Sequence, residues 1–510
     1  MKFIAFNPVS SIFLLLCLPV FNKSNDLLDY TSTSDAAETA TSVVNECTTG
    51  LASGGATPDG KPLLWKNRDV TNMDQEIHYF DDGRIPFISI TYRNVLPDHY
   101  GGMNAEGFAL ENSNSYNLPP GPAHNGFVDQ GDDDGKIHTL ALATCRTVDD
   151  FERLLDSTNV VGRTLTSNYG AIDAYGGAAM FESAGYEYVR YDAIDATDGF
   201  IVRSNYSYAG HSLDNRRVDF GPHRHDAAYL LFQEAVRNNE LTPLTLFQKI
   251  IRDLSTDPIE ESYALPYHGY VDNHPYGCIP NYEAVCREST RGVVVMQGVC
   301  SGERPDNGII WAMCGSPLTT IATPVWVRSG SVPEELDGLN SSRICDRGIQ
   351  LLDQVYVLQN NLKSVNTWRL RNPSGTGLWD YTFPLETWVY EKTQAFTHSP
   401  QFSYDRLEAF QNEMARLIAD SLESWHPTYP VTEVSKPVFW ESNLILGWGV
   451  PEFEGQEEGV VPRGYDIFRS ESPFRTGETG ERLAIVSDTT FTDTNPLSNG
   501  GFYRIVALLD

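Results

Sequence analysis

Apolar and polar residues follow one another in short runs between residues 47 and 330, and such runs predict β-strands. The first is a strand at 62–65, which follows the turn Thr57-Pro-Asp-Gly60 and leads into Lys66. Together with the residues after Cys47, this strand predicts a hairpin. Other strands are expected at 108–110, 171–182, 186–191, 199–202, 292–296 and 309–313.

Helical periodicity is present in separate segments along the same region and beyond it. These segments are 138–155, 226–236, 244–254, 344–359 and 404–422. Strands and helices come in runs and lack a regular alternation, which favours antiparallel sheets covered by helices. The expected fold class is therefore α+β.

The pattern changes after residue 430 to β-rich sequence with Gly and Pro turns, at 444–448, 464–469 and 501–507. This change predicts a separate small all-β sandwich domain over residues 431–510. The run that ends in Trp448 and the closing strand resemble a fibronectin type III module, although the segment is short for its roughly seven strands. Any other small β-sandwich would also fit the pattern.

The amino terminus has a short apolar run, residues 12–21, behind Lys2. Such a run is too short for a permanent membrane span and is typical of an export signal. Residues 22–46 are rich in Ser, Thr, Asp and Ala, which predicts an exposed pro-segment leading to Cys47. We therefore expect a signal peptide over 1–21 and a secreted or periplasmic protein with no stable membrane span after its removal.

Composition narrows the classes of partner. The chain has 510 residues, 41% of them apolar, and a formal net charge of −31, which disfavours nucleic acids and anionic lipid surfaces. The histidines and cysteines lack the spacing of a metal site, and the acidic segment 129–135 lacks the alternation of a calcium loop. We expect neither a metal ion nor an organic cofactor.

The cysteine count singles out one thiol. If Cys17 leaves with the signal peptide, an odd number remains, and at least one thiol stays free in an oxidising compartment. Cys47 is the candidate, whereas Cys278 and Cys286 bracket a loop that a local disulfide would suit. Cleavage of the Glu46–Cys47 bond would leave a thiol and an α-amine on one residue. The amine, with a pKa near about 8, would then accept the thiol proton. A buried structural thiol is the plainer alternative.

The motifs after Cys47 resemble, over roughly residues 47–330, the amino-terminal-nucleophile hydrolases of the choloylglycine hydrolase, penicillin V acylase and acyl-CoA:6-aminopenicillanate acyltransferase type. The family has a processed Cys-Thr start and a strand ending in Arg-Asn-x-Asp. Here Cys47-Thr48 is followed by Lys66-Asn-Arg-Asp69. The resemblance implies that Asp69 orients the new α-amine and that Lys66 replaces the family's Arg near sulfur. Arg68, on the same strand face, is the other source of that cation.

Three further positions follow from the same resemblance. Asn114, which comes after the motif Gly102-Met-Asn-Ala-Glu-Gly107, matches a pocket Asn of the family, and Asn205 matches an oxyanion donor. Arg224 opens a helix, as a family Arg does that holds the site together. The plainer alternatives are a turn Asn, a glycosylation sequon at Asn205 and a solvated Arg.

The resemblance implies an αββα sandwich over residues 47–430, with a C-terminal helical extension, made as a precursor that cuts itself before Cys47. The mature enzyme would hydrolyse linear, non-peptide C–N bonds of small N-acyl amides through a Cys47 acyl-enzyme. Acyltransferase and dipeptidase activities on the same scaffold stay open. The Lys66 departure also leaves open an inactive extracellular binding or adhesion protein that contacts polymers or proteins through its C-terminal β domain.

Overall fold

The computed structural model describes residues 46–510 with several gaps. The gaps are 94–98, 122–133, 211–219, 257–262, 339–341, 360, 374, 400–401, 426–427, 431–437, 441–442, 448–463, 471–480, 488–489, 495–501 and 509–510. The predicted signal peptide, the pro-segment up to residue 45 and the acidic segment up to residue 133 therefore lie outside the described residues. None of the described helices is long and apolar enough to cross a membrane.

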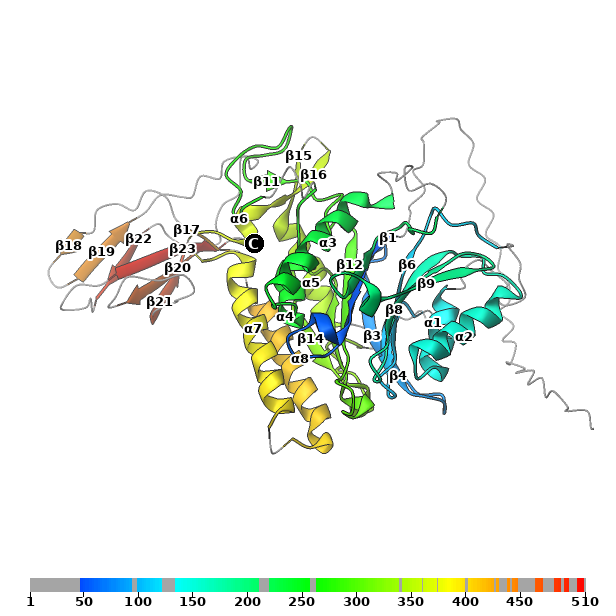
Figure 1. The fold of residues 1–510 in the computed structure, drawn as a ribbon. Coiled ribbons are helices and arrows are strands. Elements are labelled where there is room, and N and C mark those ends of the chain that lie inside the picture. The colour runs from blue at the N-terminus through cyan, green and yellow to red at the C-terminus, as the bar shows by residue number, and fades with distance from the viewer. Residues whose placement is uncertain are drawn as a thin grey trace, which may run out of the picture. The chain divides into compact units, whose positions relative to one another are not determined.

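Two antiparallel sheets form the centre of the fold (Figure 1). The six strands of sheet A are, in spatial order, β10 (Phe200–Arg203), β1 (Glu46–Ala52), β2 (Leu63–Asp69), β12 (Thr290–Gln297), β13 (Ile309–Cys314) and β14 (Thr323–Val325). The seven strands of sheet B run in chain order: β3 (Gln75–Phe80), β4 (Phe87–Tyr92), β5 (Gly101–Asn104), β6 (Ala109–Asn114), β7 (Ser167–Ile172), β8 (Ala178–Ser183) and β9 (Tyr188–Asp192). Strands β1 and β2 pack against β6, so the sheets face each other.

Helices cover the outer face of each sheet (Figure 1). Helices α1 (Asp134–Thr144) and α2 (Val148–Asn159) share one core with the outer face of sheet B. Helix α3 (Pro222–Arg237) covers sheet A, where Trp65 stacks on Phe232 with ring centroids 5.7 Å apart. The prediction of antiparallel sheets covered by helices is therefore confirmed.

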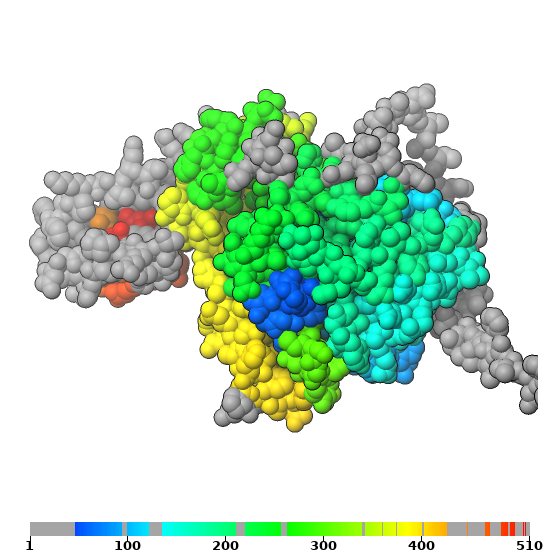
Figure 2. Space-filling model, viewed as in Figure 1, coloured from blue at the N-terminus to red at the C-terminus, as the bar shows by residue number. Residues whose placement is uncertain are grey.

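Alternation along β2 separates the two faces on which the site depends. Trp65 and Asn67 point to the helix side, because Asn67 donates hydrogen bonds to the carbonyls of Ile251 and Val285. Lys66 and Arg68 point between the sheets. The predicted hairpin is present as β1 and β2. Both strands are buried, and the blue part of the chain at the surface in Figure 2 includes the turn between them, where residues 58–60 are exposed.

Further helices extend the core around sheet A. The elements between β10 and residue 425 that complete this part of the fold are α4 (Pro243–Thr245), the π-helix η5 (Leu246–Ile250), α5 (Arg343–Val355), α6 (Thr367–Leu370), α7 (Leu378–Thr397), α8 (Leu407–Ser424) and the small sheet of β11 (Cys278–Ile279), β16 (Leu362–Asn366) and β15 (Tyr356–Gln359). The largest of these helices bury apolar side chains in the same cluster as Trp311 and Trp326.

Some element boundaries differ from those expected. The segment 138–155 is two helices, because Thr147 caps α2 in a reciprocal capping box with Asp150. The segment 171–182 is the β7–β8 hairpin, turning at Asp173, whose carboxylate accepts hydrogen bonds from Tyr175 and Gly177. Every described cysteine is a free thiol, so Cys278 and Cys286, proposed as a pair, are not bonded.

The described strands after residue 425 form two antiparallel sheets of their own. One holds β17 (Thr428–Pro430), β23 (Phe502–Leu508), β20 (Gly464–Ser470) and β21 (Glu481–Val486), and the other holds β18 (Val438–Trp440), β19 (Asn443–Gly447) and β22 (Thr490–Asp493). Their small core contains Leu446, Tyr465, Ile467 and Ile505. This sheet structure begins at Thr428, slightly before the expected boundary at 431. A fibronectin type III identity stays a prediction.

Candidate active site

Cys47 lies at the start of β1, between β2 and the end of β10. Its side chain is buried, with 8% of the residue exposed. The register pairs Cys47 with Arg68, so both point between the sheets, whereas the neighbouring pair of Glu46 and Asp69 points toward α3. The amide of Cys47 donates to Asn205 Oδ1 at 3.1 Å, and its carbonyl accepts from Arg224 Nη1 at 3.0 Å. Side chains therefore hold the main chain on both sides of the Cys47 Cα.

Two cations act on the thiol, and they act unequally. Burial raises the pKa of Cys47 above its ordinary value, Lys66 opposes this rise most strongly, and Arg68 opposes it less. The Lys66 ammonium donates to Asn112 Oδ1 at 2.5 Å. The Arg68 guanidinium instead lies over the rings of Tyr92 and Tyr100, 4.0 and 3.6 Å from their centroids. Lys66 is thus the main cation near sulfur.

Asp69 is buried beside this main chain, on the α3 side. Its Oδ1 accepts from the Thr290 hydroxyl at 2.6 Å and its Oδ2 from Arg224 Nη1 at 3.3 Å. Burial raises the pKa of Asp69 to about 6, although Arg224 and Arg287 oppose that rise. Close to neutral pH this acid can therefore both accept and release a proton.

Arg224 links the parts of the site. It is fully buried, so the alternative of a solvated Arg at a helix start is wrong. The chain enters α3 through Gly221, whose left-handed φ of 72° precedes Pro222 at the first helical position. From there the guanidinium reaches Cys47 O, Thr48 Oγ1, Asp69, Asn205 Oδ1 and the carboxylate of Glu46.

The two predicted asparagines, Asn114 and Asn205, are in direct contact. Asn205 Nδ2 donates to the main-chain carbonyl of Asn114 at 2.9 Å, and the amide of Tyr116 donates to the carbonyl of Asn205 at 3.0 Å. An amide NH₂ group has two N–H donors, so this contact leaves Asn205 a second one for a developing oxyanion. Asn205 is fully buried, and a glycan on it has no room.

The structure adds residues that the sequence analysis missed. Glu46, the residue before the nucleophile, forms ion pairs with both Arg224 and Arg287. The Thr290 hydroxyl donates a hydrogen bond to Asp69. Tyr116 also lies close to the site, where burial and the nearby Cys47 raise the pKa of its phenol. Their signals are weak in the sequence, because each reaches the site from a loop or strand end that only the fold brings there.

A buried acid, Glu111, lies on β6 on the face that looks toward sheet A. Burial raises its pKa well above its ordinary value, and the charge of Lys66 lowers it. A protonated Glu111 would leave the charge of Lys66 uncompensated on this side, which favours a thiolate at Cys47.

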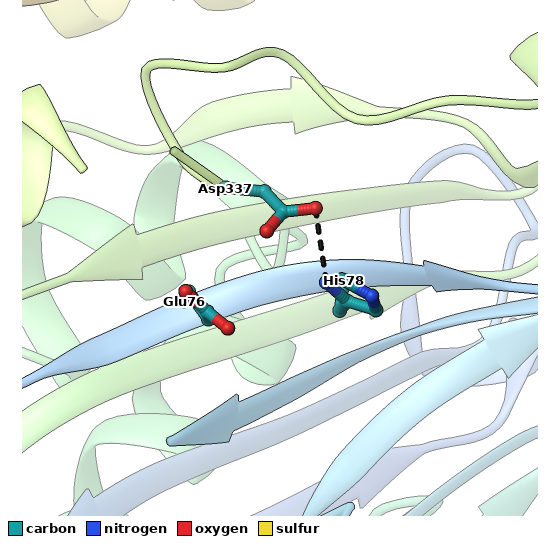
Figure 3. Close-up of side chains that lie close together, drawn as sticks. All are labelled: Glu76, His78 and Asp337. Carbon is teal, nitrogen blue, oxygen red and sulfur yellow. Dashed lines mark ion pairs between the residues drawn. The ribbon is translucent and has the colours of Figure 1, made fainter. Parts of the chain in front are cut away.

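Glu76, His78 and Asp337 lie together at the edge strand β3 (Figure 3). His78 Nδ1 and Asp337 Oδ2 are 3.0 Å apart, and this hydrogen bond raises the pKa of the imidazole. This ion pair accounts for the proximity of His78 and Asp337, and we assign no metal ion to the three groups.

Comparisons with known proteins give fold similarities only. No family model matches the sequence, and no curated protein matches it. Among solved structures, the chain is similar to two variants of the conjugated bile acid hydrolase from Clostridium perfringens. One is 12% identical over 55% of this chain and 92% of its own, with a TM-score of 0.34. The other is 13% identical over 57% and 94%, with a TM-score of 0.35. Penicillin V acylase from Agrobacterium tumefaciens is 13% identical over 55% and 86%, with a TM-score of 0.33. The roles of residues in this chain therefore rest on the geometry described above.

Proposed function

We propose that this protein is a cysteine amidase that cuts itself before Cys47 and then hydrolyses linear amides of N-acyl substrates. The observation that carries the proposal is the set of buried side chains that hydrogen-bond to the main chain of Cys47. Asn205 holds its amide, Arg224 holds its carbonyl, and the same Arg224 contacts the buried Asp69. A structural thiol would not require a buried Arg, Asp and Asn to converge on its backbone.

Self-cleavage would begin at the Glu46–Cys47 peptide bond. The Cys47 sulfur attacks the Glu46 carbonyl carbon, the C–N bond breaks, and the nitrogen takes up the thiol proton, which leaves a thioester and a free α-amine. Water then hydrolyses the thioester and releases the pro-segment. Asn205 Oδ1 already accepts a hydrogen bond from the nitrogen that becomes the amine, so the leaving group is oriented before the bond breaks.

Turnover would use the same atoms. The α-amine of Cys47 takes the thiol proton, and the thiolate attacks the substrate carbonyl. The second N–H of Asn205, with Asn114 beside it, would stabilise the oxyanion, a contribution of about 3 kcal/mol for one such donor. The amine product leaves with the proton, and water releases the acid. Asp69 and Arg224 position the ammonium and the main chain, and Lys66 favours the thiolate.

The remaining expectations belong to the same proposal. Residues 1–21 would direct export to a secreted or periplasmic location, and residues 22–46 would keep the precursor inactive. If an amine replaces water, the same thioester supports acyl transfer, and a peptide substrate would make the enzyme a dipeptidase. The Lys66 departure, which favoured an inactive binding protein, still places near the thiol a cation that opposes the rise in its pKa caused by burial.

Amino-terminal sequencing and intact mass test the proposal. We expect the wild type to begin at Cys47 and Cys47→Ala to keep residue 46 attached. Cys300→Ala, a half-buried thiol that hydrogen-bonds to the Asp59 carbonyl, is the matched control and should process normally. Active material that retains residue 46 would contradict the mechanism. A panel of bile-salt, phenoxyacetyl, long-chain acyl and dipeptide amides then separates the activities.

A further inference from the structure

The carboxylate of Glu46 lies in an anion-binding site formed by two arginines next to the nucleophile. Only 9% of the residue is exposed, and its carboxylate accepts hydrogen bonds from Arg224 Nη2 and Arg287 Nη1. Arg224 is fully buried and the Arg287 side chain is 17% exposed. Hydrogen bonds between charged groups are stronger than those between neutral groups. The planar guanidinium groups of the two arginines also fix the orientation of the carboxylate.

The chemistry of self-cleavage indicates which part of a substrate this site would bind in the mature enzyme. In both reactions Cys47 attacks a carbonyl, and the group attached to that carbonyl stays on the sulfur as the acyl group. In self-cleavage this group is the Glu46 residue, so its side chain marks where a substrate's acyl chain lies. From carbonyl carbon to carboxylate, a Glu residue has the same carbon skeleton as a glutaryl group.

Release of the pro-segment changes the two arginines differently. Arg224 keeps Asp69 and Asn205 as partners. Arg287 has Glu46 as its ion-pair partner among the described residues, so cleavage removes the one carboxylate in contact with its largely buried charge, while Asp69 and Glu283 act on it without contact. A buried cation that loses its contacting anion is costly, and a ligand carboxylate in the place of Glu46 would relieve that cost.

Other charges face the same space. Asp69 and Glu283 lie near Arg224 and Arg287, and His223 is near Glu283. Burial raises the pKa of the Glu283 carboxyl, and one of its oxygens, Oε2, is buried without a hydrogen-bond partner in the described structure. Glu283 is therefore the side chain that would compete with a substrate carboxylate for Arg287.

We propose that the mature enzyme prefers acyl groups that end in a carboxylate, of the glutaryl kind, and that Arg287 with Arg224 binds this carboxylate where Glu46 was bound. This substrate class rests on the proposed function, because it requires both self-cleavage and an acyl-enzyme on Cys47. The reaction forms a glutaryl thioester on the Cys47 sulfur, releases the amine with its proton, and uses water to release glutarate.

Matched anilides test the preference. Glutaryl 4-nitroanilide and pentanoyl 4-nitroanilide differ only in the carboxylate, and both release a coloured amine. We expect the kcat/KM of the wild type to be at least roughly tenfold higher for the glutaryl compound. Arg287→Met should bring that ratio close to unity, and Arg287→Lys should retain part of it. Arg343→Met, which removes an exposed ion pair with Glu423, should keep the wild-type ratio.

Binding of free glutarate gives a second readout that needs no turnover. Calorimetry should detect glutarate binding to the mature wild type and not to the uncut Cys47→Ala precursor, in which Glu46 fills the site. Glu283→Gln should tighten binding to the mature form by removing the competing carboxylate. Binding to both forms, or to neither, would overturn the proposal even if Arg287→Met failed to fold.

The outcomes also separate the two proposals. If the chain begins at Cys47 and cleaves the pentanoyl anilide at least as well as the glutaryl one, the carboxylate preference is wrong and the amidase stands. An unchanged ratio in Arg287→Met would likewise overturn the role of this residue alone. If residue 46 stays attached and no amide is cleaved, both proposals are overturned.

Discussion

The pKa values at the site show how far its chemistry depends on burial. Burial raises the pKa of both Cys47 and Asp69, so at neutral pH the thiol stays protonated, whereas Asp69, with a pKa of about 6, is mostly ionised. Lys66 and Arg224 act against this effect, Lys66 on the thiol and Arg224 on the acid. Because Arg224 and Asp69 are both buried, removing Arg224 would leave the Asp69 carboxylate uncompensated in a low dielectric, which is more damaging than losing a surface ion pair.

Asp69 makes a testable contribution to stability. Its pKa is about 6 in the folded protein against an ordinary 3.8, so the folded state binds more protons between these pH values. Its contribution is therefore greatest below about pH 4 and is lost as pH rises through 6. In the uncut Cys47→Ala background, the added change Asp69→Asn should remove a fall in unfolding free energy on the order of 2 kcal/mol between pH 4 and 7.

Urea unfolding at several pH values measures this difference. Asp253, whose pKa burial also raises to about 6, is unaffected by the substitution and contributes equally to both proteins. Parallel stability profiles for the two proteins would mean that Asp69 is ionised throughout, contrary to the expected direction.

The start of helix α3 makes an element-scale prediction. Gly221 has a φ of 72°, and a Cβ built there would overlap the Arg224 guanidinium. Gly330 has a φ of 74° and open space around its own Cβ. Both Gly→Ala changes should cost about 1 kcal/mol of stability for the left-handed backbone. Only Gly221→Ala should also slow self-cleavage, by at least roughly tenfold, or about 1.4 kcal/mol of barrier.

Thermal unfolding and a time course of cleavage on gels separate these two effects. Equal cleavage rates in both variants would mean that the entry into α3 does not position Arg224.

The pattern of apolar and polar residues was sufficient to predict the strands and helices that depend on neighbouring residues alone. Strand β2 was expected from its apolar run, and α8 from its periodicity. Helix α7 was not expected, because it contains Pro384 and apolar residues around much of its circumference. Segment 344–359 was expected to be helical throughout, yet its last residues form β15, because β16 offers them a partner strand.

The same division applies to the site. Cys47, Asp69, Asn205 and Arg224 could be proposed because short motifs around them resemble, in the same order, those of a known hydrolase family. Arg287, on a loop, contacts Glu46, which lies 241 residues away in the sequence. The residues around these two positions do not indicate that they meet. Pairings of that kind depend on tertiary packing, which a single sequence does not display.

At the scale of the whole molecule, the apolar clusters divide the chain near residue 425. The main core includes the buried residues of α8, among them Leu407, Met414, Ile418 and Leu422. The strands after Trp425 have a separate small core. The C-terminal β domain stays a prediction, and it would be dispensable for the chemistry if it contacts polymers or other proteins.

Two truncations test this division. A chain that ends at Trp425 should still cut itself before Cys47 and should unfold within about 3 °C of the full chain, since less than about 1 kcal/mol of catalytic-domain stability would be lost.

A chain that ends at Thr397 also loses α8. Its four large apolar side chains contribute roughly 1.5 to 3 kcal/mol each, which together match the whole stability of a typical domain, about 5 to 15 kcal/mol. The shorter chain should therefore neither fold nor cleave itself, as circular dichroism and gels would show. A folded, self-cleaving shorter chain would place α8 outside the catalytic core, and an unfolded chain ending at Trp425 would make the C-terminal sheets part of it.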